Sequence, residues 1–449
     1  MEEPFLRAKI EMDGLSETCS YCEQEGNTFS IDQIADSVAA IFADVYRLTE
    51  APEGRSVVTL IKNLAGLDEP AADDVRCVLK ERRANEHLEI GVEDDSFDTG
   101  SRYTRSVDAW EFDWQWRRFE ESLKTETRYF NRETEEVLTS IFDGIDRYHT
   151  ITGRPVVAEA GPGTDLAELY RARIFFQAEG DLREAMKRPD LAIGPPPCSK
   201  AVAGRLNATG ISVFYGATHP DVALAEVRPP VGSKVLIGCF EVVQPLKLLD
   251  LVAIADLADE DGSLFDEDYR ARLKRAQFLR GLGRRLSKPV MPNDEPLEYL
   301  PTQAVADFLA SAATLSLDGI VYPSVQNGHG HRRYGLFGAG RYRYHCNVVL
   351  FHKTARVQQL DEGADISISD DSFVSYLLPD VPDNRPDVRY TVQVANAKTD
   401  PPTDNVGDAA LRFSSLEVHY VRGVRFETES SSIPRYLEQN GEGNDGPNT

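Results

Sequence analysis

Positive charge is scarce in this sequence of 449 residues, in which 49 Lys and Arg stand against 74 Asp and Glu, for a formal net charge of −25. A general nucleic-acid binder needs a basic surface to contact phosphates, so we expect no nucleic-acid partner. The deficit is concentrated in residues 1–150, which hold 17 Lys and Arg against 34 Asp and Glu. A pocket for an anionic small molecule is therefore expected later in the chain, with arginines of its own.

Long apolar runs and a cysteine framework are also missing. The longest apolar runs, such as 348–351, have the length of a strand and are too short to cross a bilayer, so no membrane partner is expected. The amino terminus shows no basic region followed by an apolar stretch, and six cysteines do not form a disulfide framework in a chain of this size. We therefore expect a reduced, cytoplasmic protein.

Cys19 and Cys22 have the spacing of half a zinc site. A structural zinc needs two more ligands, and residues 1–150 offer only Cys77, His87 and His149, without the spacing of a second pair. A redox role is disfavoured because no β-α-β pattern follows. A structural zinc at this pair stays open.

The chain divides near residue 155. Before it, helical periodicity is found at 28–48, 57–67, 71–85 and 110–150. Trp110, Trp114 and Trp116 lie in the last of these stretches and are interpreted as core anchors of a helical domain.

After residue 155 short β-rich segments are separated by turns and helices. Strands are expected at 211–215, 234–243, 246–251, 318–322 and 347–351, and helices at 220–228, 267–286 and 302–313. This mixture without strict alternation predicts an α+β fold. Residues 356–435 are expected to form a carboxy-terminal extension with strands that ends in a hairpin, and residues 436–449 a disordered tail.

Glu226 stands out because it directly follows the apolar run 222–225. The segment opens at Pro220 and stops before Pro229, as a short helix would. In that helix Glu226 shares the face of Val222, so we expect its carboxylate to point inward. A carboxylate there is costly unless another group pairs with it or uses it.

Four segments in this order resemble the RES domain, which is named for an arginine, a glutamate and a serine. They are LYR at 169–171, GRLNATG with VFYGATHPDVALAE at 204–226, DGIVYPS at 318–324, and NVVLF at 347–351. The resemblance covers roughly residues 165–353. The acidic first part, with its CSYC motif at 19–22, is similar to the HEPN/RES amino-terminal domain.

This resemblance implies an all-α HEPN/RES-like domain over 1–155 and, over 160–355, a RES catalytic domain with an ADP-ribosyltransferase-like mixed α/β fold. RES proteins are bacterial toxins that consume NAD+ and release nicotinamide by hydrolysis or phosphorolysis, or in some members ADP-ribosylate a protein. We therefore expect an NAD+ glycohydrolase or phosphorylase of a toxin–antitoxin or defence system, with NAD+ as substrate and no required metal. An antitoxin or regulatory protein is an expected partner, and so is a second copy in a homo-oligomer. A protein ADP-ribosyltransferase that uses the same pocket is the alternative.

The resemblance also implies roles for single residues. It assigns catalytic roles to Glu226, Arg171, Ser324 and Tyr215, and NAD+ binding to Arg171, Arg205, Asn207, Tyr215, Ser324 and Asn347. Leu206 departs from the family pattern, which usually has a tryptophan there, and this changes the packing near Asn207.

The residue types suit that chemistry. The pyrophosphate of NAD+ calls for cations that bind in a bidentate way, which arginine supplies best. Cleavage of the nicotinamide–ribose bond develops positive charge on the ribose, and an ionised Glu226 beside it stabilises that charge. Structural interpretations stay open: Arg171 and Glu226 as a buried ion pair, Ser324 as a turn residue and Tyr215 as part of the core.

A second alternative is a HEPN-type ribonuclease, because Arg82 and His87 have the spacing of its arginine and histidine. The acidic surroundings disfavour this interpretation, since they repel RNA. We instead expect residues 1–150 to control the enzyme, with an acidic face that covers its arginine-lined entrance. A chain that starts near residue 155 is then expected to keep the active site.

Overall fold

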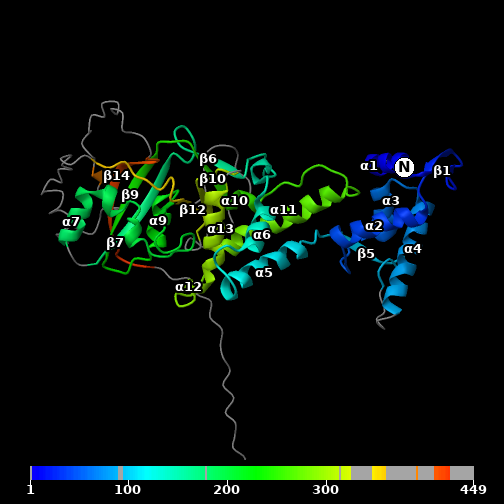
Figure 1. The fold of residues 1–449 in the computed structure, drawn as a ribbon, viewed down its shortest axis with the longest axis horizontal. Coiled ribbons are helices and arrows are strands. Elements are labelled where there is room, and N and C mark those ends of the chain that lie inside the picture. The colour runs from blue at the N-terminus through cyan, green and yellow to red at the C-terminus, as the bar shows by residue number, and fades with distance from the viewer. Residues whose placement is uncertain are drawn as a thin grey trace, which may run out of the picture.

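The computed structural model describes residues 3–88, 95–176, 179–312, 315–324, 346–360, 391–392 and 409–424. Two bodies lie along the longest axis of the molecule and are bridged by long helices (Figure 1). The described part combines many helices with one large sheet, so the predicted α+β class is confirmed. None of its described helices has both the length and the apolar character needed to cross a bilayer.

The first body, residues 3–107, is built mainly from helices. They are α1 (Pro4–Asp13), α2 (Ile31–Val45), α3 (Val57–Ala65) and α4 (Glu69–Leu88). The expected helices at 28–48, 57–67 and 71–85 are thereby confirmed. Ser30 starts α2 with a reciprocal capping box to Gln33, and the apolar face of the helix is buried.

Two small sheets make the prediction of an all-α amino-terminal domain wrong. β1 (Leu15–Thr18) and β2 (Glu25–Thr28) form a hairpin, and β3 (Tyr46–Leu48), β5 (Arg102–Arg105) and β4 (Arg55–Ser56) form a sheet in that order. The reason is non-local: residues 102–105 come back to pair with the segments that leave α2 and enter α3.

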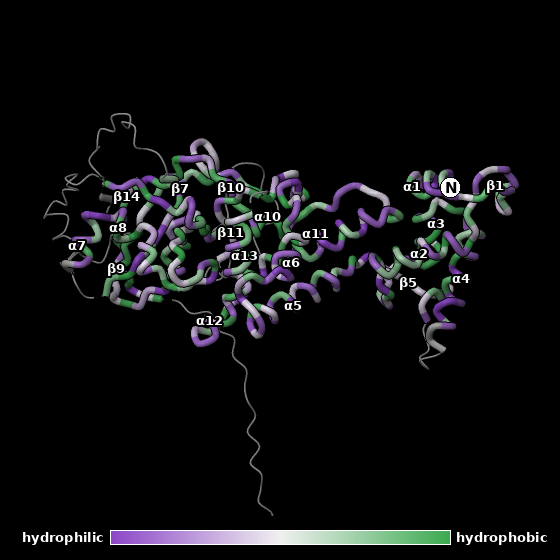
Figure 2. The backbone as a smooth tube through the Cα atoms, in the orientation of Figure 1, coloured by the Kyte–Doolittle hydropathy of each residue, from purple (hydrophilic) through white to green (hydrophobic). Residues whose placement is uncertain are grey.

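The bridging helices are α5 (Trp110–Thr125) and α11 (Glu267–Leu286), and α6 (Arg132–Phe142) and α13 (Leu300–Ser311) lie beside them in the second body (Figure 1). The helices expected at 267–286 and 302–313 are thereby confirmed. Hydrophobic and hydrophilic residues are mixed along α5 and α11, as in helices with one buried face (Figure 2). Phe119 and Phe142 belong to the same buried cluster as Leu249 and Phe351 of the large sheet region. The cores of the structure therefore do not follow the expected boundary at residue 155, because 109–156 pack with what comes after.

The interpretation of all three tryptophans as core anchors holds for Trp116 alone. Its side chain is 2% exposed, whereas Trp110 and Trp114 are each 57% exposed. Residues 110 and 114 lie about one helical turn apart on the outer face of α5, and residue 116 lies on the opposite, packed face.

A nine-stranded sheet has the order β13-β14-β9-β7-β8-β12-β11-β10-β6. In chain order the strands are β6 (Val157–Ala160), β7 (Glu168–Phe175), β8 (Phe214–Ala217), β9 (Lys234–Val242), β10 (Leu246–Asp250), β11 (Gly319–Pro323), β12 (Cys346–Leu350), β13 (Thr391–Val392) and β14 (Leu411–Tyr420). All pairs are antiparallel except β10 with β11. The strands expected after residue 155 are present, although β8 begins at 214 instead of 211.

The sheet divides between β7 and β8. Only the pair Tyr170–Ala217 joins these two strands, while β7 pairs with β9 along its whole length from Glu168 to Phe175. The four strands on the β7 side and the five on the β8 side therefore form two half-sheets that meet at one point.

Short helices complete the second body: α7 (Glu179–Lys187), α8 (Pro189–Ala192), α9 (Pro220–Glu226), α10 (Leu251–Ile254) and α12 (Glu295–Glu298), with 3₁₀ turns at Ile145–Arg147 and Cys198–Lys200. Strand β14 pairs with β9 and β13, so the predicted carboxy-terminal extension supplies strands to the sheet. The predicted tail at 436–449 lies outside the described residues, and so does the second half of the predicted final hairpin.

Candidate functional site

Glu226 is the centre of a small polar cluster. Ser324 Oγ donates to its Oε1 across 2.6 Å, and Asn347 Nδ2 donates to the same atom across 2.8 Å. Both donors are 4% exposed. Among the described residues no hydrogen-bond partner reaches Oε2 of Glu226. One carboxylate oxygen is thus fixed, and within the described part of the chain the other is available to a ligand.

The local sequence explains where Glu226 lies. His219 caps α9 by accepting from the backbone N–H of Asp221, and Pro220 fits the first turn. Val222 and Ala223 are buried, but Glu226 is the last residue of the helix and is exposed. The carboxylate of Glu226 points toward the buried side chains of Ser324 and Asn347, but the residue itself is not buried with Val222 and keeps contact with solvent.

Strands β11 and β12 bring the two donors to this carboxylate. Tyr322 of β11 is paired with Asn347 of β12, so the two side chains share one face of the sheet. Ser324 follows β11 directly and lies on the same face as Tyr322, because strand side chains alternate.

Tyr215 and Asn207 organise the neighbouring loop at 204–207. Tyr215 donates its hydroxyl to Asn207 Oδ1 across 2.9 Å and accepts from the backbone N–H of Leu206 at the same distance. The Asn207 amide nitrogen donates to three backbone carbonyls, those of Val202, Ala208 and Ile211. These contacts engage both polar atoms of the Asn207 side chain within the loop. Burial raises the pKa of Tyr215 to about 12, so its hydroxyl stays protonated at neutral pH.

Gly204 makes this arrangement possible. A Cβ at this position would lie 2.7 Å from Asn207 Oδ1 and 2.9 Å from the Tyr215 hydroxyl oxygen, closer than real Cβ contacts. The glycine of the GRLN segment is therefore required by close packing.

Arg205 reaches the carboxy-terminal end of α11. Its Nη1 donates to the carbonyls of Leu286 at 3.2 Å and Lys288 at 2.8 Å, and its guanidinium lies over the Tyr299 ring at 5.0 Å from the centroid. The last carbonyls of a helix lack partners within it and attract a cation. The guanidinium of Arg205 is thus fixed by the carbonyls at the carboxy-terminal end of α11.

Arg171 does not touch Glu226. Tyr170 and Ala172 pack beside α9, so Arg171 points to the opposite face of β7, where its guanidinium lies over Phe214 at 5.3 Å from the ring centroid. The proposed structural ion pair between Arg171 and Glu226 is absent from the described residues. Instead, Nη1 of Arg171 is shielded from solvent and has no hydrogen-bond partner in the described part of the chain. Burial lowers the pKa of Arg171 to about 10.

Tyr322 is the site residue that the sequence reasoning missed. Burial raises its pKa well above the ordinary value, and Tyr215, Glu226 and Arg205 are near enough for their charges to contribute. Tyr322 is paired with Asn347 across β11 and β12, so it lies on the face of the sheet that carries the Glu226 cluster. The signal was in the sequence, since strand alternation places Tyr322 on the same face as Ser324.

The features singled out in the amino-terminal body give no comparable site. Arg82 is paired with Asp36 at 2.6 Å and Asp32 at 2.8 Å, and the side chain of His87 lies outside the described residues. Cys19 and Cys22 stand at the tip of the β1–β2 hairpin, and the described residues contain no group of three or more metal-ligating side chains there or elsewhere.

Comparison with known protein families matches residues 169–371 to the RES domain. No curated protein and no solved structure matches the chain. The expected limits of 165–353 agree with this match at the start and stop short of it at the end. The similarity of the first 155 residues to the HEPN/RES amino-terminal domain stays a prediction.

Proposed function

From the match of residues 169–371 to the RES domain, we propose that the protein consumes NAD+ by breaking the bond between nicotinamide and ribose. The family is generally linked to NAD+-consuming toxins, which supports this class of reaction. The proposal includes toxicity: expression is expected to arrest bacterial growth through loss of NAD+.

The observation that carries the proposal is the state of the Glu226 carboxylate. Ser324 and Asn347 fix one oxygen with two donors, and the exposed residue offers the other. A preorganised negative charge of this kind stabilises the positive charge that develops on the ribose as nicotinamide leaves.

The buried guanidinium of Arg171 supports an anionic substrate. Its Nη1 is shielded from solvent and has no hydrogen-bond partner among the described residues, which is unfavourable for a cation, and an anion that reaches it removes the penalty. Arg171 directly follows the single residue pair that joins the two half-sheets. We propose that the pyrophosphate of NAD+ approaches Arg171 at this junction while the ribose lies at Glu226.

The remaining groups suit a reaction without a strong acid. Nicotinamide leaves as a neutral molecule, so no proton has to be delivered to it. The Tyr215 hydroxyl is protonated at neutral pH and already engaged with Asn207, so its ring is the part free to orient the substrate. Arg205, Asn207, Ser324 and Asn347 are proposed to shape the pocket, and no residue is assigned to a metal.

The acceptor of the ADP-ribose can be water, phosphate or a protein side chain. These three outcomes define an NAD+ glycohydrolase, a phosphorylase and a protein ADP-ribosyltransferase, which would share the Glu226 pocket. We propose a small acceptor, water or phosphate, because both reach an exposed carboxylate without a dedicated protein-binding surface.

The test is product analysis by liquid chromatography and mass spectrometry after incubation of the full-length protein with NAD+, with and without inorganic phosphate. We expect nicotinamide together with ADP-ribose, or with its phosphorylated form when phosphate is present. Transfer of ADP-ribose to added protein would select the transferase. Intact NAD+ after prolonged incubation, together with degraded RNA, would replace the proposal with the ribonuclease.

A further inference from the structure

We propose that the amino-terminal body positions the site arginine Arg205 through helix α11, and that Phe265 is the positioning residue that anchors this helix. The expected effect on the KM for NAD+ rests on the proposed function above. The coupling between Phe265 and the Arg205 loop concerns the fold alone, so it can be measured without NAD+ turnover.

The first contact is apolar. Phe265, which precedes α11 in the second body's sequence, is 7% exposed and belongs to the buried cluster of the amino-terminal body, and Leu264 packs against the same cluster. Ser263 adds a hydrogen bond to Glu3 across 2.7 Å. Residues about 260 positions apart in the chain thus meet at this end of α11. Because a buried phenylalanine side chain stabilises the contact that covers it, Phe265 attaches this end of α11 to the amino-terminal body.

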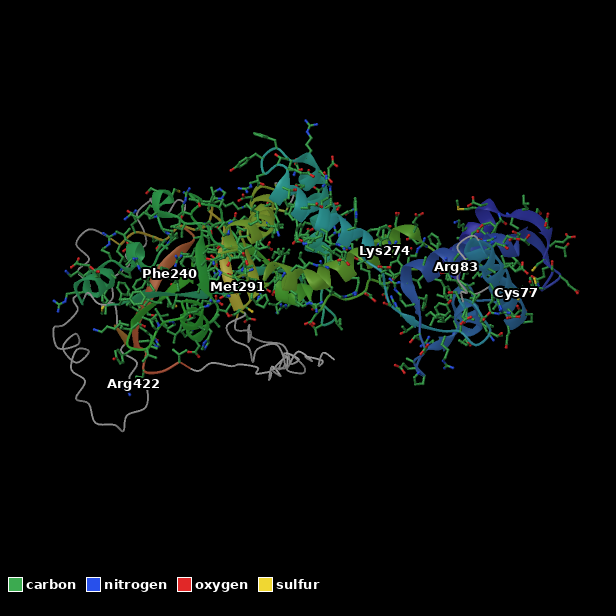
Figure 3. All side chains as sticks on the ribbon, turned by 90° about the horizontal axis from the view of Figure 1, so that it is seen from below. Cys77, Arg83, Phe240, Lys274, Met291 and Arg422 are labelled. Carbon is green, nitrogen blue, oxygen red and sulfur yellow. The ribbon has the colours of Figure 1, made fainter. Side chains whose placement is uncertain are left out.

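The second contact is ionic. Asp44 of α2 pairs with Arg270 at 2.8 Å and with Lys274 at 2.7 Å, both on the first turns of α11. The three side chains are 11–21% exposed, so solvent and salt screen them less than a surface pair. Lys274 is labelled in Figure 3 on the side of α11 that adjoins the amino-terminal body.

The other end of α11 holds Arg205. The carbonyls of Leu286, the last residue of the helix, and of Lys288 accept from Arg205 Nη1. The hydroxyl of Thr302 in α13 donates to the Arg205 carbonyl, so the loop backbone is held as well. Any displacement of these carbonyls changes where the guanidinium can lie.

The helix between these ends can transmit a displacement. Its 20 residues span about 30 Å. Phe278, in its middle, packs against Phe112 at 5.8 Å and Trp116 at 5.8 Å between ring centroids. A Cβ at Gly283 would lie 2.9 Å from the Leu251 carbonyl, so the helix lies tightly on α10. A close-packed helix moves as a rigid element.

The expectation that the acidic amino-terminal body covers the entrance of the site is wrong within one chain. The acidic amino-terminal body lies at the opposite end of the long axis from α9 and β7, so within one chain it does not cover the arginine-lined site (Figure 1). Control by this body therefore passes through the bridging helices, and among the described residues α11 contacts both Asp44 of the amino-terminal body and Arg205.

The first experiment compares Phe265→Ala with Phe97→Ala in the full-length protein. Phe97 lies in the same buried cluster but packs on Phe42 and Tyr103, so it is the matched control. Hydrogen exchange is followed at the backbone amides of residues 204–207, where Gly204 N–H donates to the Asn207 carbonyl. We expect roughly 3- to 30-fold faster exchange in this loop for Phe265→Ala only. Equal loop exchange in both variants would overturn the coupling.

The second experiment is milder and covers the case in which a large core deletion unfolds the body. Asp44→Asn removes the partner of Arg270 and Lys274, and Asp44→Glu restores the charge. We expect the KM for NAD+ to rise roughly 3- to 30-fold in Asp44→Asn with kcat changed less than about twofold, and to return in Asp44→Glu. An unchanged KM together with unchanged loop exchange would overturn the proposal. A wild-type protein that leaves NAD+ intact, but whose loop exchange responds to Phe265→Ala, would refute the proposed function and keep the coupling.

Discussion

Ser324 and Glu226 are 98 positions apart in the chain and meet through a hydrogen bond of 2.6 Å from the serine hydroxyl to Oε1 of the glutamate. Asn347 donates to the same oxygen. Both donors come from the end of one strand pair, so the fold of the sheet fixes the orientation of the carboxylate. The serine of the motif therefore acts on the glutamate, and its expected effect on the substrate passes through that residue.

A double-mutant cycle tests this relationship. Ser324→Ala and Asn347→Ala should each lower kcat by about tenfold or more, because a hydrogen bond to a charged group is worth about 1.5–3 kcal/mol. In a Glu226→Gln background Ser324→Ala should have little further effect, since the charge that it holds is gone. Additive losses would show that Ser324 contacts the substrate independently.

Arg171→Met should separate stability from binding. The variant replaces a cation whose Nη1 is shielded from solvent and has no hydrogen-bond partner among the described residues with an apolar side chain of similar length, so the free energy of unfolding should rise by about 1 kcal/mol or more. The KM for NAD+ should rise as well, because the proposed phosphate contact is lost. Thermal unfolding with and without NAD+ measures both effects. A destabilised variant with unchanged KM would show that Arg171 only supports the fold.

Much of the fold could be predicted from the sequence because the signals are local. Helix α11 has the expected bounds, and Asp266 caps its start because its side chain accepts a hydrogen bond from the backbone N–H of Asp268. The order of the strands and the junction between β7 and β8 could not be predicted, because pairing depends on residues far apart in the chain. The exposure of Trp110 and the burial of Phe265 in the amino-terminal body could not be predicted for the same reason, because both depend on packing between segments far apart in the chain.

The site could be predicted as a set of residues but not as a geometry. The motifs placed Glu226, Ser324 and Asn347 in the site, and the structure brings these three into contact. Periodicity predicted a carboxylate that points inward, but it did not predict that Glu226, as the last residue of a short helix, stays exposed to solvent. Arg171 lies on the other face of its strand, and no short-range pattern shows how the half-sheets come together there.

Truncated chains test the finding that residues 109–156 pack with the second body and not with the amino-terminal body. A chain that starts at residue 155 lacks Phe119 and Phe142, which are buried against the second body, so it should aggregate, contrary to the sequence-based expectation. A chain that starts at residue 108 keeps α5 and α6 and should be markedly more soluble. Soluble yield and light scattering compare the two. A well-folded, monodisperse chain from residue 155 would contradict the division.

The hairpin cysteine Cys19 should react at unusually low pH. The backbone N–H groups of Tyr21 and Cys22 donate to its sulfur and lower its pKa below the ordinary thiol value. The thiolate is therefore present at pH values where an ordinary thiol is protonated. Iodoacetamide labelling followed by peptide mass spectrometry should modify Cys19 faster than Cys198 below pH 8. Equal rates would contradict this, and protection of Cys19 by added Zn²⁺ would revive the zinc interpretation.

The central claim is that the Glu226 carboxylate carries NAD+ cleavage, and the most direct test is nicotinamide release by Glu226→Gln. Glu184→Gln is the matched control, because Glu184 is an exposed carboxylate of the same body and its ion-pair partner among the described residues is Lys187. Removal of a preorganised charge from the transition state costs about 3 kcal/mol, so Glu226→Gln should lose about a hundredfold or more in kcat with its thermal unfolding temperature retained. Glu184→Gln should match the wild type. A Glu226→Gln variant that releases nicotinamide at the wild-type rate per folded molecule would contradict the account.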